Sequence, residues 1–556
     1  MVGVAFAALI GRLFYYQCIM TGILSTKAAY NQTAQEVLPH HRGTIYDRNG
    51  NALAVSVDAM TVAVIPSKVK DPRWIANNMA KKLGSDLTVD EYYEKLTGST
   101  YQIVARKVDY SAAEELRQLI IEENIRRNDS GSDVLIDGIE FIRTTRREYP
   151  YEDIAGTVVG VVDEDGNGLT GIEKRHNDIL TGVDGLLIER RGITGEAVVG
   201  GQISRDEAQD GTDIVLSIDI DIQREAQEQL AQAVYDWGAR EGCVVVMQCK
   251  TGELLACAST PYLNPADLRN SDVLSPTLKC VSYAYEPGST FKPITAAMAV
   301  ELGLAEPTTV YDVPAQIEVG TDLVGDVDLR TEEVQMTLTN ILERSSNVGA
   351  VMVAESVGAQ QFSRYSERFK IGMPTGIDFD DESYGIVPKL KDYTGAWTSM
   401  SFGQGLAVPP VQMARAIGAI ANEGIIVEPH FLIAKGSDVV TPSTGERVIS
   451  TATAHKVGNM MYSVIENGYG ISGRVEGYRL SGKTGTSERL DPNTGTYSSD
   501  SYTASFIGFG PTQDPQVLVY VLVDDVPAGG SQVVGQPWSA IMLTALQKLQ
   551  IAPTVT

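Results

Sequence analysis

The pattern of apolar and polar positions first marks two hairpins. In the segment 43–53, an Asn-Gly turn separates Ile45 from Leu53, and this dipeptide is typical of two-residue hairpin turns. In the segment 243–259, the polar residues Lys-Thr-Gly-Glu join two apolar runs, which is the same pattern with a longer turn. Each segment is therefore predicted to form a pair of antiparallel strands.

Helical spacing of apolar residues marks several other segments. It predicts helices over 112–123, 223–237, 291–304, 412–422 and 538–549. Apolar runs with strand character predict further strands over 213–222, 502–510 and 517–524. Helices that alternate with antiparallel hairpins are typical of the α+β class, which we expect for the second half of the chain.

The length of 556 residues exceeds what one hydrophobic core usually organises, so we expect at least two domains. A Gly-rich polar stretch covers residues 192–211, and we place a domain boundary near residue 206 within it. The main part of the chain is thus expected to divide into 23–205 and 206–556.

The N-terminal segment starts with an apolar run at 2–10, which Arg12 separates from a second run at 13–20. A membrane-spanning helix needs about 20 apolar residues, so the first run alone is too short. A truncated membrane anchor, a signal peptide and a buried helix are the three interpretations. A signal peptide would need a basic start and a small-residue cleavage site, and neither is clear.

The composition excludes some classes of function. A net charge of −26 argues against nucleic-acid binding, which requires a basic surface. Five cysteines are too few for a disulfide framework, and no Cys-x-x-Cys or His-Glu-x-x-His motif indicates a metal site. Cys243 and Cys249 share the parity of their apolar neighbours, so we expect packed thiols on one face of a buried strand.

Residues 163–168, Asp-Glu-Asp-Gly-Asn-Gly, imitate the start of a calcium-binding EF-hand loop. The twelfth position of such a loop should be a bidentate glutamate, but here it is Lys174, with Glu173 one place early. We therefore expect a turn here, and we expect neither a metal nor a cofactor in this protein.

Three short motifs that could carry nucleophilic chemistry follow one another along the chain: Ser289-Thr290-Phe291-Lys292, Ser345-Ser346-Asn347 and Lys483-Thr484-Gly485-Thr486. Each is a weak signal alone. Residues 67–70 form a second Ser-x-x-Lys, and residues 250–252 form a second Lys-Thr-Gly. The surroundings must therefore separate functional motifs from coincidental ones.

Ser289 has the local setting of a nucleophile. A Pro-Gly pair precedes it and an apolar helical run follows, so it should open a helix with Pro293 in the first turn. Ser289 and Lys292 would then lie on one helix face. Lys292 could take the serine proton if burial or a positive charge such as that of Lys483 lowers its pKa. Ser67 has no such helix after it.

Longer strings around these motifs resemble one family. Tyr285–Lys292 (YEPGSTFK) and Ser401–Gly405 (SFGQG) resemble the transpeptidase domain of class B penicillin-binding proteins. Arg42–Gly50 (RGTIYDRNG) and Gly171–Glu173 (GIE) resemble the N-terminal half of that class. The chain is thereby identified as a member of the family over nearly its whole length.

The resemblance implies the architecture. It implies a truncated membrane anchor at 1–22, an elongated and mainly β pedestal or dimerisation domain at 23–205, and a transpeptidase domain at 206–556. In the last domain an antiparallel sheet is expected between helices, with residues 483–486 on a strand that faces Ser289.

The resemblance also implies the roles of the site residues. Ser289 would attack the penultimate D-Ala carbonyl of a peptidoglycan stem peptide, and Lys292 would take its proton. Ser345 would relay a proton to the departing D-Ala, while Asn347 contacts the substrate. The strand motif Lys483, Thr484, Gly485 and Thr486 would bind the terminal carboxylate, and the N–H groups of Ser289 and Thr486 would form an oxyanion hole.

The same resemblance implies the cellular setting. A single-pass anchor would hold the catalytic domain outside the bacterial membrane, where β-lactam antibiotics also react with it. A membrane glycan polymerase and division proteins are the expected partners, and Glu286 before Pro-Gly-Ser favours division or sporulation over elongation. A β-lactam-sensing receptor and a serine β-lactamase are the alternatives.

Overall fold

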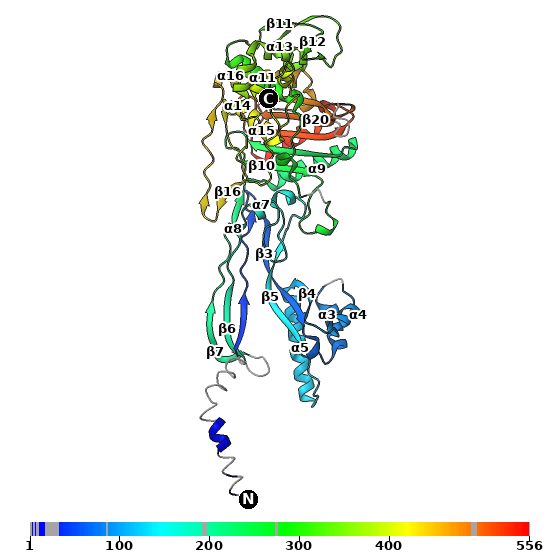
Figure 1. Cartoon of the computed structure of the whole chain (residues 1–556), viewed down its shortest axis with the longest axis vertical. Coiled ribbons are helices and arrows are strands. Elements are labelled where there is room, and N and C mark those ends of the chain that lie inside the picture. The colour runs from blue at the N-terminus through cyan, green and yellow to red at the C-terminus, as the bar shows by residue number, and fades with distance from the viewer. Residues whose placement is uncertain are drawn as a thin grey trace. The chain divides into compact units, whose positions relative to one another are not determined.

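The computed structural model describes residues 3, 6, 11–16, 33–84, 87–191, 197–272, 276–490 and 497–554. The chain forms two compact units (Figure 1). The first comprises 1–43, 55–148 and 178–212, and the second comprises 44–54, 149–177 and 213–556. The two units are thus interleaved along the first 212 residues, and residues after 212 belong to the second unit alone.

The first unit contains a core between three helices and three strands. The helices are α3 (Pro72–Lys82), α4 (Val89–Leu96) and α5 (Tyr110–Asp129), and the strands are β3 (Ala52–Val64), β4 (Gln102–Asp109) and β5 (Ile139–Glu148). Strand β3 pairs antiparallel with both β4 and β5. Alternate residues of β3, Met60, Val62 and Val64, pack against Ile75 and Leu116 of the helices. The helix predicted over 112–123 is confirmed as part of α5.

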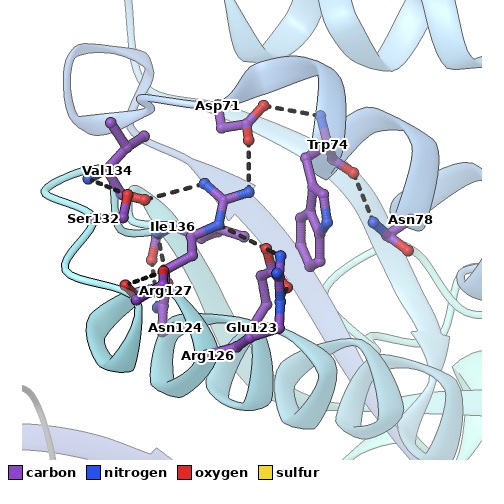
Figure 2. Close-up of polar contacts among 11 residues, drawn as sticks. Asp71, Trp74, Asn78, Glu123, Asn124, Arg126, Arg127, Ser132, Val134 and Ile136 are labelled. Atoms are coloured by element: carbon purple, nitrogen blue, oxygen red, sulfur yellow. Dashed lines mark hydrogen bonds and ion pairs between the residues drawn. The ribbon is translucent and has the colours of Figure 1, made fainter.

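A cluster of polar contacts fixes the end of α5 (Figure 2). The guanidinium of Arg127 lies 2.7 Å from carboxylate oxygens of both Asp71 and Glu123, and it donates a hydrogen bond to the Val134 carbonyl at 3.1 Å. Asp71 also accepts from the backbone N–H of Trp74 and so caps α3. One arginine therefore joins two helices and the loop that follows α5.

The first unit also contains a separate antiparallel sheet. Its order is β1 (Thr33–Leu38), β6 (Gly185–Arg191) and β7 (Ala197–Asp206). The Gly-rich stretch predicted to be a boundary thus includes a described strand, β7.

The second unit is built on a five-stranded antiparallel sheet. Its order is β10 (Leu254–Thr260), β9 (Glu241–Gln248), β21 (Val517–Val526), β20 (Tyr497–Gly510) and β19 (Ser481–Leu490). One face packs on α9 (Ile220–Trp237) and α18 (Gly535–Lys548), whose apolar side chains share a core with Val244, Val246 and Val519. Helices α15 (Pro410–Ala421) and α16 (Thr451–Asn467) also contact the sheet. Gly418 of α15 lies beside Met247, whose side chain is on the opposite face of β9 from Val244 and Val246. The expected α+β fold is confirmed.

Most predicted elements of this unit are present. The hairpin at 43–53 is β2 (Ile45–Tyr46) paired with β3, and the hairpin at 243–259 is β9 paired with β10. The strand predicted over 213–222 is too long, because β8 covers only Ile214–Leu216. Asp219 then accepts hydrogen bonds from the N–H groups of Asp221 and Ile222 and starts α9. A helix cap therefore ends the strand early.

Two further predictions concern the apolar N-terminal run and the cysteines. Most of the apolar N-terminal run lies outside the described residues, and no described helix is long and apolar enough to cross a bilayer. The four described cysteines are free and buried, which confirms packed thiols. Cys243 lies in β9, but Cys249 follows the last residue of that strand.

Candidate active site

Ser289 lies in a short helical turn that leads directly into a longer helix. The turn η4 spans Gly288–Phe291, and α11 spans Lys292–Glu301, with Pro293 in its first turn as predicted. Gly288 has φ +55°, and a Cβ at this position would lie 3.2 Å from atoms of Thr486 and Ser487. Glycine is therefore needed both for the backbone conformation and for the close approach of β19.

Lys292 is buried beside the nucleophile. Its Nζ lies 3.0 Å from Ser289 Oγ, 3.2 Å from Ser345 Oγ and 2.7 Å from Asn347 Oδ1, and only 1% of the residue is exposed. Burial, and then the charge of Lys483, lower the pKa of Lys292 well below its usual value. The lowered pKa favours the neutral amine, which is the form of lysine that can accept a proton.

Ser345 lies between the two lysines. It occupies the link between α12 (Leu338–Glu343) and α13 (Asn347–Val357). Its Oγ lies 2.9 Å from Ser289 Oγ and 2.9 Å from Lys483 Nζ. A continuous chain of polar contacts thus runs from Lys292 through Ser289 and Ser345 to Lys483.

The Lys-Thr-Gly-Thr motif lies on β19, the edge strand of the sheet among the described strands. Lys483 is fully buried, and burial lowers its pKa to about 7. A Cβ at Gly485 would lie 2.3 Å from Ser505 Oγ and 2.9 Å from Thr290 of the nucleophile turn. Thr484 is buried, whereas Thr486 is exposed and its Oγ1 accepts from the Gly530 N–H.

This arrangement can carry out nucleophilic catalysis without histidine or metal. A serine hydroxyl needs a base within hydrogen-bonding distance, and the Lys292 amine lies 3.0 Å from Ser289 Oγ. Ser345 provides a second hydroxyl through which a proton can move. No group of three or more His, Cys, Asp or Glu in the described part of the chain could hold a metal ion.

Comparison with known proteins agrees with this chemistry. Residues 242–543 match the family described as penicillin binding protein transpeptidase domain, and residues 37–216 match the penicillin-binding protein dimerisation domain. The chain belongs to the penicillin-binding protein transpeptidase family. The class B resemblance predicted from the motifs is thereby confirmed.

Individual relatives cover most of this penicillin-binding protein. PbpB of Mycolicibacterium smegmatis is 31% identical over 92% of this chain and 83% of its own length. Stage V sporulation protein D of Bacillus subtilis is 30% identical over 98% of this chain and 83% of its own length. The solved structure of penicillin-binding protein 3 from Mycobacterium tuberculosis with aztreonam has a TM-score of 0.71 at 26% identity, over 94% and 99% of the two chains.

The competing motifs of this penicillin-binding protein lie in different settings. Ser67 is exposed within the three-residue turn η2 (Pro66–Lys68), and Lys70 is exposed just after that turn. Lys250 lies in the turn between β9 and β10 and pairs with Asp514 at 2.8 Å. Asp163 accepts from the N–H groups two and four residues later, so the EF-hand-like segment forms a turn closed by its own backbone.

The SFGQG string, Ser401–Gly405, contacts the turn η4 that carries Ser289. Gly403 has φ +80°, and its carbonyl accepts a hydrogen bond from the Gly288 N–H at 3.1 Å. A Cβ at Gly403 would lie 2.2 Å from the Gly288 carbonyl oxygen. The Ser401 carbonyl accepts from Thr295 of α11. This string therefore positions the turn that carries Ser289.

Sequence reasoning missed two residues beside the site, Asp326 and Arg330. Asp326 is 7% exposed and accepts hydrogen bonds from Ser346 and Asn347, the last two residues of the second motif. It forms an ion pair with Arg330 at 3.0 Å. Asp326 lies 19 residues and Arg330 15 residues before Ser345, and no recognised pattern marks them.

Proposed function

We propose that this protein is a D,D-transpeptidase that cross-links peptidoglycan stem peptides through an acyl-enzyme on Ser289. The observation that carries the proposal is the position of Ser289 Oγ, 3.0 Å from Lys292 Nζ and 2.9 Å from Ser345 Oγ. The nucleophile thus has a base on one side and a hydroxyl for proton transfer on the other.

In the acylation step, Ser289 Oγ attacks the carbonyl carbon of the penultimate D-Ala while Lys292 Nζ takes the hydroxyl proton. The N–H groups of Ser289 and Thr486 stabilise the oxyanion. The peptide C–N bond then breaks, and the proton held by Lys292 passes through Ser345 to the departing D-Ala amine. An ester bond to Ser289 replaces the peptide bond.

Substrate binding is assigned to the edge strand and to the second motif. Lys483, Thr484 and Thr486 bind the terminal carboxylate, and Gly485 lets the strand lie close to the nucleophile turn. Asn347 donates to the substrate from its amide nitrogen, because its Oδ1 is directed at Lys292. The free edge of β19 offers backbone groups that an extended peptide can pair with.

In the deacylation step, the amine of a second stem peptide attacks the ester carbonyl. The amine loses a proton to the Lys292–Ser345 pair, and Ser289 regains one as the C–O bond breaks. A new peptide bond joins the two stems, so charge and protons balance over the cycle. β-Lactams acylate the same hydroxyl when their ring amide opens.

The proposed cellular setting follows from family membership. A membrane anchor at 1–22 would place the pedestal domain, 23–205, and the transpeptidase domain, 206–556, outside the cell membrane. A membrane glycan polymerase and division proteins are the proposed partners. Division or sporulation is the proposed growth phase, supported by Glu286 and by the similarity to stage V sporulation protein D of Bacillus subtilis.

Fluorescent penicillin followed over hours, together with a cross-linking assay on paired stem peptides, tests this proposal. We expect one stable label per chain, loss of label in Ser289→Ala, and formation of cross-linked dimer from the peptides. Absence of label on the wild-type protein, or persistence of label on Ser289→Ala, would contradict the proposal.

The same experiment separates the alternatives. Rapid loss of the label, faster than any cross-linking, would indicate a β-lactamase, because such an enzyme must hydrolyse its acyl-enzyme. A stable label without cross-linking of paired stem peptides would indicate a sensor that uses acylation only as a signal.

A further inference from the structure

The turn that carries Ser345 is conformationally costly and must be held in place. Ser345 has φ +55°, a left-handed conformation that is unfavourable for a non-glycine residue. The turn is fixed on its upstream side because the N–H groups of Ser345 and Ser346 donate to the carbonyls of Leu342 and Ile341. These bonds orient the backbone before Ser345 but leave the position of Asn347 to be set by other contacts.

Asp326 fixes the downstream side of the turn. One carboxylate oxygen accepts from the N–H groups of Asn347 at 2.7 Å and Val348 at 3.1 Å, and the other accepts from Ser346 Oγ at 2.7 Å. The carboxylate therefore lies at the first turn of α13, where the exposed N–H groups favour a negative charge. The adjacent Gly325 carbonyl accepts from Asn347 Nδ2 at 3.4 Å, which directs Oδ1 of that amide toward Lys292.

Arg330 holds Asp326 in this orientation. Its Nη2 lies 3.0 Å from the same carboxylate oxygen that accepts from Ser346. Its Nε–H donates to that oxygen as well, at 3.3 Å, and N–H groups of Nη1 and Nη2 donate to the carbonyls of Val313, Pro314 and Glu332. The side chains of this ion pair are only 4% and 10% exposed. Arg330 thus connects the second motif, through Asp326, to strand β11 (Val310–Val313).

The negative charge of Asp326 also acts on Lys292 without a direct contact. The hydrogen bonds of Lys292 go to Ser289, Ser345 and Asn347, while the oxygens of Asp326 are occupied by their own donors. Two charged groups act on Lys292: the Lys483 ammonium lowers its pKa and the Asp326 carboxylate raises it. Asp326 and Lys483 therefore have opposite effects on the pKa of Lys292.

We propose that Asp326, oriented by Arg330, is a positioning residue for acyl transfer, which fixes Ser345 and Asn347 against Lys292 and opposes the effect of the Lys483 charge on Lys292. The proposal rests on the transpeptidase function proposed above. It assigns no contact between Asp326 and the substrate.

The pH dependence of acylation tests this role. The second-order rate constant for fluorescent penicillin is measured from acid to neutral pH on wild type, Asp326→Asn, Asp326→Ala and the control Asp328→Asn. Asp328 is an exposed carboxylate two residues along the same loop. Rates are expressed per site labelled at completion, so that an unfolded fraction does not lower them.

We expect Asp326→Ala to lose about 100-fold in rate, the cost of displacing a catalytic group by about 1 Å. Asp326→Asn keeps one oxygen for the N–H groups of α13 but loses the charge. The pKa of Lys292 then falls further, so the acidic limb of the Asp326→Asn profile should move to lower pH. Asp328→Asn should match wild type.

A pH profile of Asp326→Asn that coincides with those of wild type and Asp328→Asn would overturn the proposal. If Asp326→Ala does not fold, the conservative Asp326→Asn variant still decides the question. Failure of the transpeptidase function itself is distinguishable, because it would appear as absent labelling of wild type or as labelling of Ser289→Ala.

Discussion

Two serine–lysine pairs of identical spacing occur in this protein, and they lie in opposite environments. Ser67 and Lys70 are exposed near a three-residue turn of the first unit. Lys292 is 1% exposed at the start of α11, with Ser289 at 3.0 Å and Lys483 close enough to affect its charge. The two pairs share the same sequence spacing, but only the lysine of the Ser289 pair is buried.

Burial is what distinguishes the two pairs chemically, because it lowers the pKa of Lys292. Desolvation disfavours the ammonium form of a lysine, and a neighbouring ammonium disfavours it further. Both effects act on Lys292 and lower its pKa well below the usual value, which favours the neutral amine. The predictions below test this difference.

The largest effect is expected from removing the base. Lys292→Met should lower the acylation rate by about 10²- to 10⁴-fold, because Ser289 loses its proton acceptor. Lys70→Met, at the matching position of the exposed pair, should leave the rate unchanged. Fluorescent penicillin labelling under single-turnover conditions measures both, and equal effects of the two substitutions would remove the distinction between the pairs.

The next effect concerns the neighbouring charge. Lys483→Met should lower the acylation rate by about 100-fold if Lys483 binds the terminal carboxylate as proposed. It should also move the acidic limb of the pH profile to higher pH. The sign follows because the positive charge of Lys483 lowers the pKa of Lys292, so its removal keeps Lys292 protonated to higher pH. A shift to lower pH would contradict this account.

A smaller effect is expected from Gly288→Ala. The substitution imposes a left-handed strain of about 1 kcal/mol and places a Cβ 3.2 Å from β19, so Ser289 should shift and acylation should slow. Gly238→Ala is the matched control, because Gly238 has φ +59° but nothing within 4 Å of the added carbon. Both variants should lose stability in thermal unfolding, and only the first should lose rate.

The smallest effect on acylation is expected from the first unit. Arg127→Met should destabilise that unit, since it removes the guanidinium that Asp71 and Glu123 share (Figure 2). The adjacent Arg126 is 73% exposed, so Arg126→Met should change stability little. Chemical unfolding measures the difference, and the acylation rate per labelled site should stay at the wild-type value in both.

Local patterns predicted much of the fold. The pattern of apolar and polar residues correctly predicted the hairpins at 43–53 and 243–259 and the helix within α5. The strand predicted over 213–222 was wrong beyond residue 216, because the cap formed by Asp219 outweighs the apolar pattern. The interleaving of the two units could not be predicted, since it depends on contacts between segments far apart in sequence.

The candidate site was predicted only where family motifs exist. The residues of the three motifs are brought together, and Pro287-Gly288 marks the turn before Ser289 as expected. Asp326 and Arg330 were missed because their relation to the second motif is made through space and not by spacing. Burial of Lys292, which decides its pKa, likewise depends on the whole packed unit.

The site of covalent attachment tests the central claim most directly. After reaction with penicillin, peptide mapping by mass spectrometry should place the penicilloyl group on Ser289, and Ser67→Ala should be labelled at the wild-type rate. A penicilloyl group on Ser67 or on any other residue, with Ser289→Ala still labelled, would contradict the account.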